Sequence, residues 1–561
     1  RVARLTARRH DDGTFHYFRY RPDGALLEAE NETGIVAFDR DGLGRAVKER
    51  RGDHAVVSQY DPDGLRSLVE TSLGGRQMIL RDALGKARAL HLGRNKARQP
   101  IVEFERDEAG FEMGRQLPGG VRIEWRRDLA GRPTLRRTLR RTPTGAHETH
   151  RLTYRWEEAD QLRELVDSRV GPARYTHDAR GRLILEERPG TTLHRAMDQV
   201  GNIYRTADGH DRRYGRGGRF ERADGKTYRH DASGNLAERH DPDGNIWRYH
   251  WNGSGLLREV ERPDGRMVRF EYDAFARRTR KATVRVDADG RESFEHEVQF
   301  VWDGNVVIHE LFPGHAPPTT WYWQPESFTP IAREAEERCW PIASDHLGAP
   351  TEMYDEAGQI AWRTRLDVFG SGRNDVALQH CPWRWPGQYF DEETGLHYNR
   401  HRYYDPSFGQ YISCDPIGLS GGSRPYGYAR NPVSWTDPLG LTECNEFTQT
   451  ELAAVEEVRQ IPLGQLRGAF EAGGAELQIG GRTIVVEPGM PASGMTLFGE
   501  NGFVLGREAF TSDAELTRTL LHETHRLMTS QSAGGITGEL ATHETNAAFS
   551  FAERAYQAFF R

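Results

Sequence analysis

Two aspartates stand in matching five-residue motifs. Asp415 begins one Asp-Pro-x-Gly-Leu motif and Asp437 begins the other. Two carboxylates held close together can hydrolyse a peptide bond, because their like charges separate the two pKa values and so supply a base for water and an acid for the amide. In each motif the proline fixes the turn that orients the aspartate. The residue types alone leave an alternative, in which both aspartates only form Asp-Pro turns.

A second group of reactive residue types lies near the C-terminus, in His522-Glu523-Thr524-His525-Arg526. One interpretation is a zincin-like metallopeptidase, which places His-Glu-x-x-His on a helix and a third ligand on a later helix. In that interpretation His522 and Glu544 bind zinc. The fifth position of the motif holds Arg526 instead of histidine, and His525 stands one residue early, so the segment departs from the zinc motif.

Three other interpretations stay open for this segment. A metal-independent nuclease would use His522 or His525 as general base and Arg526 to stabilise developing charge on phosphorus. Residues 442–561 carry sixteen acidic residues against eight arginines and no lysine, a formal charge of −8, which disfavours a polyanionic substrate. An NAD-dependent transferase is a further possibility. In the last interpretation the segment is a solvated helix face, although a second His-Glu-Thr cluster at 543–545 favours a shared polar cleft.

A helix must position these side chains. Ser512 and Glu515 form a capping box, which marks a helix start. The helical period places three leucines on one face and the two histidines with Arg526 on the opposite side; the leucines are Leu516, Leu520 and Leu527. Helices are also predicted at 451–461 and 540–560, and hairpins that turn at 480–481 and 501–502. Residues 442–561 are therefore predicted to form a small α+β domain.

The first 280 residues repeat a short phrase of an aromatic residue, Asp or Arg, two linking residues, Gly and an aliphatic residue. Its clearest register places Tyr228, Tyr249 and Phe270 21 residues apart. Glycine supplies the positive φ of the hairpin turns, and the runs between turns alternate apolar with charged residues, as strands do. Each repeat is thus predicted to supply two strands that bury their apolar face only by stacking on neighbours.

Residues 387–414, GQYFDEETGLHYNRHRYYDPSFGQYISC, and the two Asp-Pro motifs that follow closely resemble the conserved end of the core of bacterial Rhs (rearrangement hotspot) proteins. The upstream phrases resemble the YD repeats of that family. The resemblance implies a mostly β protein, in which an antiparallel β-sheet spiral forms a hollow shell (cocoon) that is followed by an α+β toxin domain. The expected divisions are 1–290 for the repeats, 291–386 for their continuation, 387–441 for the core-associated motif and 442–561 for the toxin.

The same resemblance implies an aspartyl-protease-like self-cleavage of the Leu441–Thr442 bond by Asp415 and Asp437. It further implies an immunity protein and a delivery apparatus such as type VI secretion, or a separate N-terminal shell fragment. An alternative function is a YD-repeat protein of cell-surface recognition, or a shell component of an insecticidal complex.

The composition agrees with a β-sheet that has solvent-exposed faces. Hydrophobic residues make up 37% and charged residues 28%, which is polar for a chain of this length. The four cysteines have no paired spacing, so no disulfide or zinc framework is expected. No membrane span and no signal peptide are visible, and the first residue is Arg1, so export is expected to use a route that reads no cleaved leader.

Overall fold

The computed structural model describes residues 5–441, apart from 23, 84, 94–99, 109, 129, 158–160, 288, 315–316 and 419–423. It also describes 454–529, apart from 456, 460, 480 and 498–500, together with 552 and 555. Contacts divide the chain into two compact units, Arg1–Asn445 and Glu446–Arg561. Each unit is described by itself.

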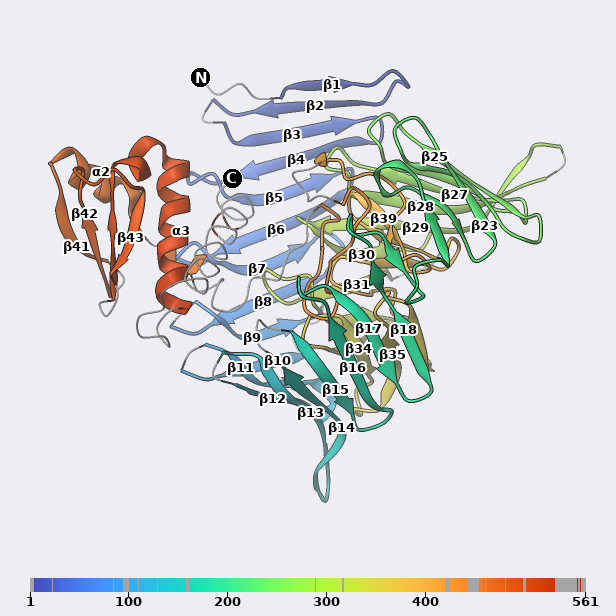
Figure 1. The fold of residues 1–561 in the computed structure, drawn as a ribbon, viewed down its shortest axis with the longest axis horizontal. Coiled ribbons are helices and arrows are strands. Elements are labelled where there is room, and N and C mark those ends of the chain that lie inside the picture. The colour runs from blue at the N-terminus through green and yellow to red at the C-terminus, as the bar shows by residue number, and fades with distance from the viewer. Residues whose placement is uncertain are drawn as a thin grey trace. The chain divides into compact units, whose positions relative to one another are not determined.

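The first unit contains an 18-stranded antiparallel sheet in which each strand pairs with the next strand along the chain (Figure 1). Its strands are β1 (Ala7–Arg9), β2 (Phe15–Tyr20), β3 (Leu26–Asn31), β4 (Gly34–Arg40), β5 (Ala46–Arg51), β6 (His54–Tyr60), β7 (Arg66–Thr71), β8 (Arg76–Arg81), β9 (Ala87–Leu92), β10 (Ile101–Arg106), β11 (Glu112–Leu117), β12 (Val121–Arg127), β13 (Pro133–Thr142), β14 (Gly145–Trp156), β15 (Leu162–Asp167), β16 (Gly171–His177), β17 (Leu183–Arg188) and β18 (Thr191–His194).

A short hairpin, β19 (Ala196–Met197) and β20 (Ile203–Tyr204), leads to a 16-stranded meander of the same kind. Its strands are β21 (Arg212–Tyr214), β22 (Phe220–Ala223), β23 (Lys226–His230), β24 (Leu236–His240), β25 (Ile246–Trp251), β26 (Leu257–Glu261), β27 (Arg266–Tyr272), β28 (Arg278–Val286), β29 (Glu292–Asp303), β30 (Val306–Leu311), β31 (Thr319–Trp323), β32 (Pro330–Ala335), β33 (Arg338–Ser344), β34 (Pro350–Tyr354), β35 (Ile360–Leu366) and β36 (Gly372–Ala377).

The repeat register is confirmed by this second meander. Tyr228, Tyr249 and Phe270 lie on β23, β25 and β27, so each 21-residue repeat supplies two strands, and all three rings are buried in one core. The core closes against a third sheet made of β37 (Tyr389–Asp391), β38 (Leu396–Asn399), β39 (Arg402–Asp405) and β40 (Gln410–Tyr411). The ring of Phe270 lies 5.2 Å from that of Tyr403 on β39.

The repeat turns have one recurring construction. In the turn after β27 the Asp273 Oδ1 atom accepts the backbone N–H groups of Phe275 and Arg277, at 2.9 and 3.0 Å. Most glycines of these turns have a positive φ as predicted, for example +89° at Gly234, and in the turn after β27 Ala276 takes this conformation, with φ +59°. The Asp of the phrase therefore closes its own turn, a role that the sequence pattern did not reveal.

The second unit is a small α+β domain, as predicted. Its sheet has the order β41 (Ala475–Ile479), β42 (Arg482–Val486), β44 (Gly502–Leu505), β43 (Gly494–Leu497). Both predicted hairpins are present, and β42 pairs with β44 in parallel, which was not predicted. The helices are α2 (Leu463–Glu471), the 3-10 turn η5 (Arg507–Thr511) and α3 (Asp513–Thr529); residues 454–455 and 457–459 are also helical.

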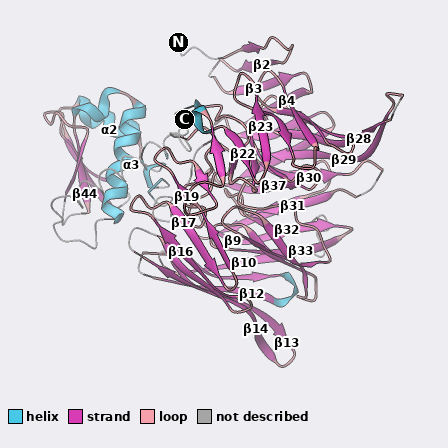
Figure 2. Cartoon of the chain, turned by 45° about the vertical axis from the view of Figure 1, so that its right-hand side comes forward, coloured by secondary structure: helices cyan, strands magenta, loops and turns pink. Residues whose placement is uncertain are grey.

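Figure 2 shows that the regular secondary structure of the first unit consists almost entirely of strands. Helix α3 begins at the predicted capping box, where the Glu515 N–H donates to Ser512 Oγ at 3.0 Å. Leu516 and Leu520 of α3 pack with Ile484 and Phe503 in the core of the unit.

Among the described residues no helix is both apolar enough and long enough to cross a bilayer. The predicted helix 540–560, with Glu544, lies outside the described residues except for 552 and 555.

Candidate functional site

The two Asp-Pro motifs form the predicted turns and both aspartates are buried. Asp415 Oδ1 accepts the N–H of Ile417 at 3.0 Å. Asp437 Oδ1 accepts the N–H of Leu441 at 2.9 Å. Only 8% of Asp415 and 2% of Asp437 is exposed, so neither is an ordinary surface turn.

Arg402 on β39 joins the two turns. Its Nη2 atom lies 3.0 Å from Asp415 Oδ2 and 3.2 Å from Asp437 Oδ2. Its Nε atom donates to the carbonyl oxygen of Gly440 at 2.5 Å. One guanidinium therefore contacts both carboxylates and the peptide group just before the expected cut. The structure links Asp415 and Asp437 through Arg402, a residue that the sequence analysis missed.

Asp437 is surrounded by donors. The hydroxyl of Tyr411 on β40 donates to its Oδ2 atom at 2.8 Å. The amide of Asn399 on β38 donates to the Tyr411 hydroxyl and to the Asp437 backbone carbonyl, each at 2.7 Å. The Arg402 guanidinium also stacks on the Tyr411 ring, with its carbon 3.8 Å from the ring centre. Strands β39 and β40 thus supply two side chains that contact this carboxylate, Arg402 and Tyr411, and β38 supplies the amide that holds Tyr411.

The expected cause of pKa separation was repulsion between the two aspartates. The structure shows a different cause: burial raises the pKa of Asp415, while the neighbouring Arg402 and the Ile417 N–H act in the opposite direction. A buried Asp415 can thus hold a proton near neutral pH more readily than an exposed aspartate.

Two glycines let the turn of Asp437 sit closely against the third sheet. A Cβ on Gly387 would lie 2.0 Å from the carbonyl oxygen of Pro438. A Cβ on Gly440 would lie 2.5 Å from the carbonyl oxygen of Asn399. Both glycines also have positive φ, +83° and +67°. Any side chain at either position would push the turn away from Arg402.

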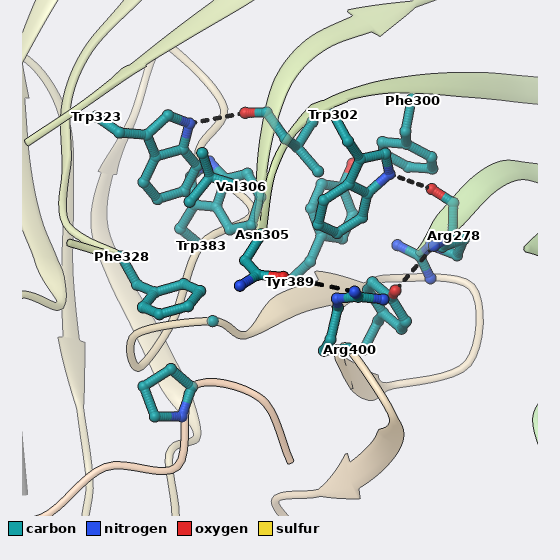
Figure 3. A pocket seen from close by; sticks show the side chains of 14 residues that line it. Arg278, Phe300, Trp302, Asn305, Val306, Trp323, Phe328, Trp383, Tyr389 and Arg400 are labelled. Carbon is teal, nitrogen blue, oxygen red and sulfur yellow. Dashed lines mark hydrogen bonds between the residues drawn. The ribbon is translucent and has the colours of Figure 1, made fainter. Parts of the chain in front are cut away.

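Figure 3 shows a small cavity beside this turn. Its volume is about 20 Å³, room for roughly one water molecule. Pro438 of this turn is one of its 14 lining residues, and seven others are aromatic: Phe300, Trp302, Trp323, Phe328, Trp383, Tyr389 and Tyr398. Trp302 and Trp323 are fixed by hydrogen bonds of 2.7 Å to backbone carbonyls. The wall against which the turn packs is therefore rigid.

A buried ion network attaches the third sheet to the second meander. Arg278, the first residue of β28, forms a two-pronged pair with Asp391 of β37, at 2.5 and 3.1 Å. Lys281 lies 3.1 Å from the same carboxylate. The Tyr272 hydroxyl lies 2.8 Å from that of Tyr403, the neighbour of Arg402. Strands far apart in sequence thus fix the strand that carries Arg402.

The second candidate site lies on α3. His522, Glu523, Thr524 and His525 are all less than one-tenth exposed, so the interpretation as a solvated helix face is wrong. Glu523 accepts a hydrogen bond from Thr496 of β43 at 2.5 Å, and burial raises its pKa, against the effects of Thr496 and Arg526. The Nε2 atom of His522 lies 3.8 Å from Glu523 Oε1.

The donor set on α3 does not fit a zinc site. The guanidinium of Arg526 acts on Glu523 from the position where a zincin carries its second histidine, and a fixed cation opposes a metal cation there. Within the described part of this unit no three His, Cys, Asp or Glu side chains converge on one point. The other predicted ligand, Glu544, lies outside the described residues. The described side chains of α3 therefore supply acid–base groups and not a set of metal ligands.

Comparison with known proteins gives consistent results. The teneurin YD-shell family model matches residues 142–420. The chain is 30% identical to double-stranded DNA deaminase toxin A of Burkholderia cenocepacia, over 79% of this chain and 33% of that protein. It is 29% identical to toxin protein Tse5 of Pseudomonas aeruginosa, over 78% of this chain and 38% of that protein. The chain thus spans about a third of the length of these relatives.

Among solved structures, the chain is similar to the TcdB2-TccC3-TEV crystal structure, with a TM-score of 0.55 and 16% identity over 77% of this chain and 26% of that one. At this identity the likeness concerns the fold, a β-shell built from long antiparallel meanders. The repeats, the third sheet and these similarities define a YD-shell protein. The chain belongs to the Rhs (YD-repeat) family of polymorphic toxins, as the sequence motifs predicted.

Proposed function

We propose that this chain is the shell and cargo portion of a bacterial antagonism effector, and that it cuts its own Leu441–Thr442 bond. The observation that carries the proposal is the contact of Arg402 with Asp415, with Asp437 and with the Gly440 carbonyl. A buried pair of carboxylates beside a fixed peptide is the arrangement that acid–base hydrolysis of an amide requires. Two isolated turns would need no shared cation.

In the proposed reaction one carboxylate takes a proton from water as the water oxygen bonds to the Leu441 carbonyl carbon. The other carboxyl group supplies the proton that leaves with the Thr442 nitrogen. Arg402 holds the two carboxyl groups and the preceding peptide in one geometry, which removes the entropy cost of bringing them together. The products are a C-terminal Leu441 carboxylate and a tail that begins with the Thr442 amine.

The test is expression of Asp415→Asn and Asp437→Asn variants, with processing followed on a denaturing gel. Asp405→Asn is the matched control, because Asp405 is also a buried aspartate of an Asp-Pro turn and accepts the Ser407 N–H at 2.8 Å. We expect one uncut chain for each test variant and two fragments for the control. Processing of the Asp437→Asn variant at the normal rate would refute the assignment.

The proposed cleavage assigns a different role to each of three parts of the chain. Residues 1–386 are the shell, 387–441 are the self-cleaving end of the core and 442–561 are the released toxin. The relatives named as toxins favour a toxin role for the released tail. Secretion, delivery into a target cell through a specialised apparatus and an immunity protein in the producer are further parts of this proposal. Relatives named as a DNA deaminase toxin and as probable deoxyribonucleases favour an enzymatic cargo.

For the cargo we propose acid–base chemistry at Glu523 with His522. The supporting observation is a buried carboxyl group of raised pKa next to an imidazole, with Arg526 near enough to act on it electrostatically. A hydrolase is the class that this set fits best, and the charge of −8 disfavours a nucleic-acid substrate. Profiling of protein, nucleic acid and NAD after expression of residues 442–561 in bacteria would identify the substrate class.

A further inference from the structure

The two aspartates of the proposed cleavage site differ in the hydrogen bonds that their carboxylates accept from protein donors. Among the described residues, Asp437 accepts from the Tyr411 hydroxyl at 2.8 Å, the Leu441 N–H at 2.9 Å and the Arg402 guanidinium at 3.2 Å. Asp415 accepts the N–H of Ile417 and pairs with the same guanidinium at 3.0 Å. Donors stabilise the ionised form of a carboxyl group, so Asp437 has the stronger support for its charge.

The direction of the Tyr411 hydrogen is also fixed. The Asn399 amide nitrogen can only donate, and it donates to the Tyr411 oxygen at 2.7 Å. The Tyr411 hydroxyl hydrogen is therefore left to point at Asp437 Oδ2. Burial raises the pKa of Tyr411 well above its usual value, so this hydroxyl stays a donor across the neutral range. Asn399 Oδ1 is buried with no partner among the described residues.

We propose that Tyr411 and Asn399 are positioning residues that keep Asp437 ionised, so that Asp437 is the base that activates water and Asp415 is the acid that protonates the amide. The inference rests on the proposed self-cleavage and assigns a role to each carboxyl group. The Asp437 carboxylate gains the water proton as the water oxygen bonds to the Leu441 carbon. The Asp415 carboxyl group loses its proton to the Thr442 nitrogen as the carbon–nitrogen bond breaks, and one proton exchange between the two groups through water restores the starting state.

The other ionisable groups that face Asp437, besides Tyr411, are Arg402 from β39, Asp415 across that guanidinium, and Tyr428. Burial raises the pKa of Asp415, so as the proton donor it governs the basic limb of a cleavage profile. The Tyr428 hydroxyl lies 3.5 Å from the Asp437 nitrogen, and burial raises its pKa well above its usual value. His401, next to Arg402, has its pKa lowered to about 3 by burial and by its neighbouring arginines, so its ring stays neutral. The acid limb of a cleavage profile therefore reports on Asp437.

The test is the pH dependence of self-cleavage in the full chain. Precursor is labelled with radioactive methionine by brief cell-free synthesis and diluted into buffers from pH 4 to pH 8. Both fragments carry methionine, for example Met353 and Met490, so both are visible on a gel. Wild type, Tyr411→Phe and Asn399→Ala are compared with Tyr404→Phe, which removes a buried hydroxyl that donates to Phe369 and contacts neither aspartate.

We expect the acid limb to move to higher pH by about one to two pH units in Tyr411→Phe, the value of one hydrogen bond to a charged group. Asn399→Ala should move it in the same direction by less, and Tyr404→Phe should leave it in place. An acid limb that stays at the wild-type pH in Tyr411→Phe overturns the role assignment while self-cleavage stands. If Tyr411→Phe is insoluble, an unmoved limb in Asn399→Ala overturns it equally. Cleavage in Asp437→Asn would instead overturn the proposed function itself.

Discussion

The backbone N–H of Leu441 donates to the Asp437 carboxylate at 2.9 Å, across a turn of four residues. The residue that would provide the acyl side of the cut is therefore bound to one of the carboxyl groups proposed to cut it. Because the turn, Arg402 and the scissile segment belong to one chain, the local concentration of the reacting groups is set by the fold and not by the solution.

Cleavage should accordingly be unimolecular. A tenfold or hundredfold dilution of freshly synthesised precursor is expected to leave its half-life unchanged. Uncut Asp437→Asn protein mixed with wild type should stay uncut. The turn that carries residue 437 and Leu441 is buried in each molecule, so the aspartates of another molecule do not reach it. Time courses on denaturing gels measure both, and a half-life that lengthens on dilution would contradict the prediction.

Arg402→Met should abolish processing and destabilise the first unit. The substitution leaves two buried carboxylates without their cation, and the loss of one partner from a buried pair costs about 3–5 kcal/mol. A triple variant, Arg402→Met with Asp415→Asn and Asp437→Asn, should regain much of the stability and none of the cleavage. Thermal unfolding and gel analysis of both proteins separate the structural effect from the chemical one.

Gly387→Ala should block cleavage although the residue touches neither aspartate. The new methyl group would meet the Pro438 carbonyl at 2.0 Å and displace the turn. Gly42→Ala is the control, since a Cβ there has no neighbour within 4 Å and the backbone needs no positive φ. We expect full-length chain for Gly387→Ala and two normal fragments for the control.

Acid should weaken the first unit in part through His401. Burial lowers the pKa of His401 to about 3, so below its unfolded value of about 6.5 the unfolded chain takes up the proton and the folded chain does not. Stability contributed by the neutral ring is complete above pH 6.5 and declines as the pH falls towards 3. Between pH 6.5 and pH 5 the loss is about 2 kcal/mol. Denaturant unfolding of His401→Gln should show a correspondingly smaller loss over that interval.

Glu523→Gln should remove the growth inhibition caused by residues 442–561. Glutamine keeps an oxygen acceptor for Thr496, so the fold should be retained while proton transfer is lost. Glu508→Gln, at an exposed position of η5, is the control and should remain inhibitory. Plate dilution assays measure the effect, and undiminished inhibition by Glu523→Gln would exclude this residue from the chemistry.

The features that could be predicted from the sequence are those that depend on residues close together along the chain. The positive φ of Gly234, the capping box at Ser512 and the two-strand repeat are consequences of a few adjacent residues, and the structure confirms them. Arg402 could not be found this way, because its partners lie 13 and 35 positions along the chain and only the folded sheet joins them. The available signal was the basic run at 400–402 upstream of both motifs, which does not by itself show which residue turns inward.

The same limit explains the misses in the second unit. Helix α2 was not predicted, since two glycines interrupt its apolar pattern. The parallel pairing of β42 with β44 arises from sheet order, which hairpin signals do not encode. The burial of His522 and His525 depends on what packs around α3, and helical periodicity describes only the face that the leucines occupy.

The construction of the Asp273 turn also affects how the number of repeats can change during evolution. Because the aspartate satisfies N–H groups two and four residues away, the backbone donors of such a turn need no partner outside its own few residues. A recombination event that inserts or deletes one whole 21-residue unit would leave the bends on either side intact. The number of strands in the meanders could therefore change by whole repeats, while Arg278 and strands β37 to β40 keep the geometry of the proposed cleavage site unchanged.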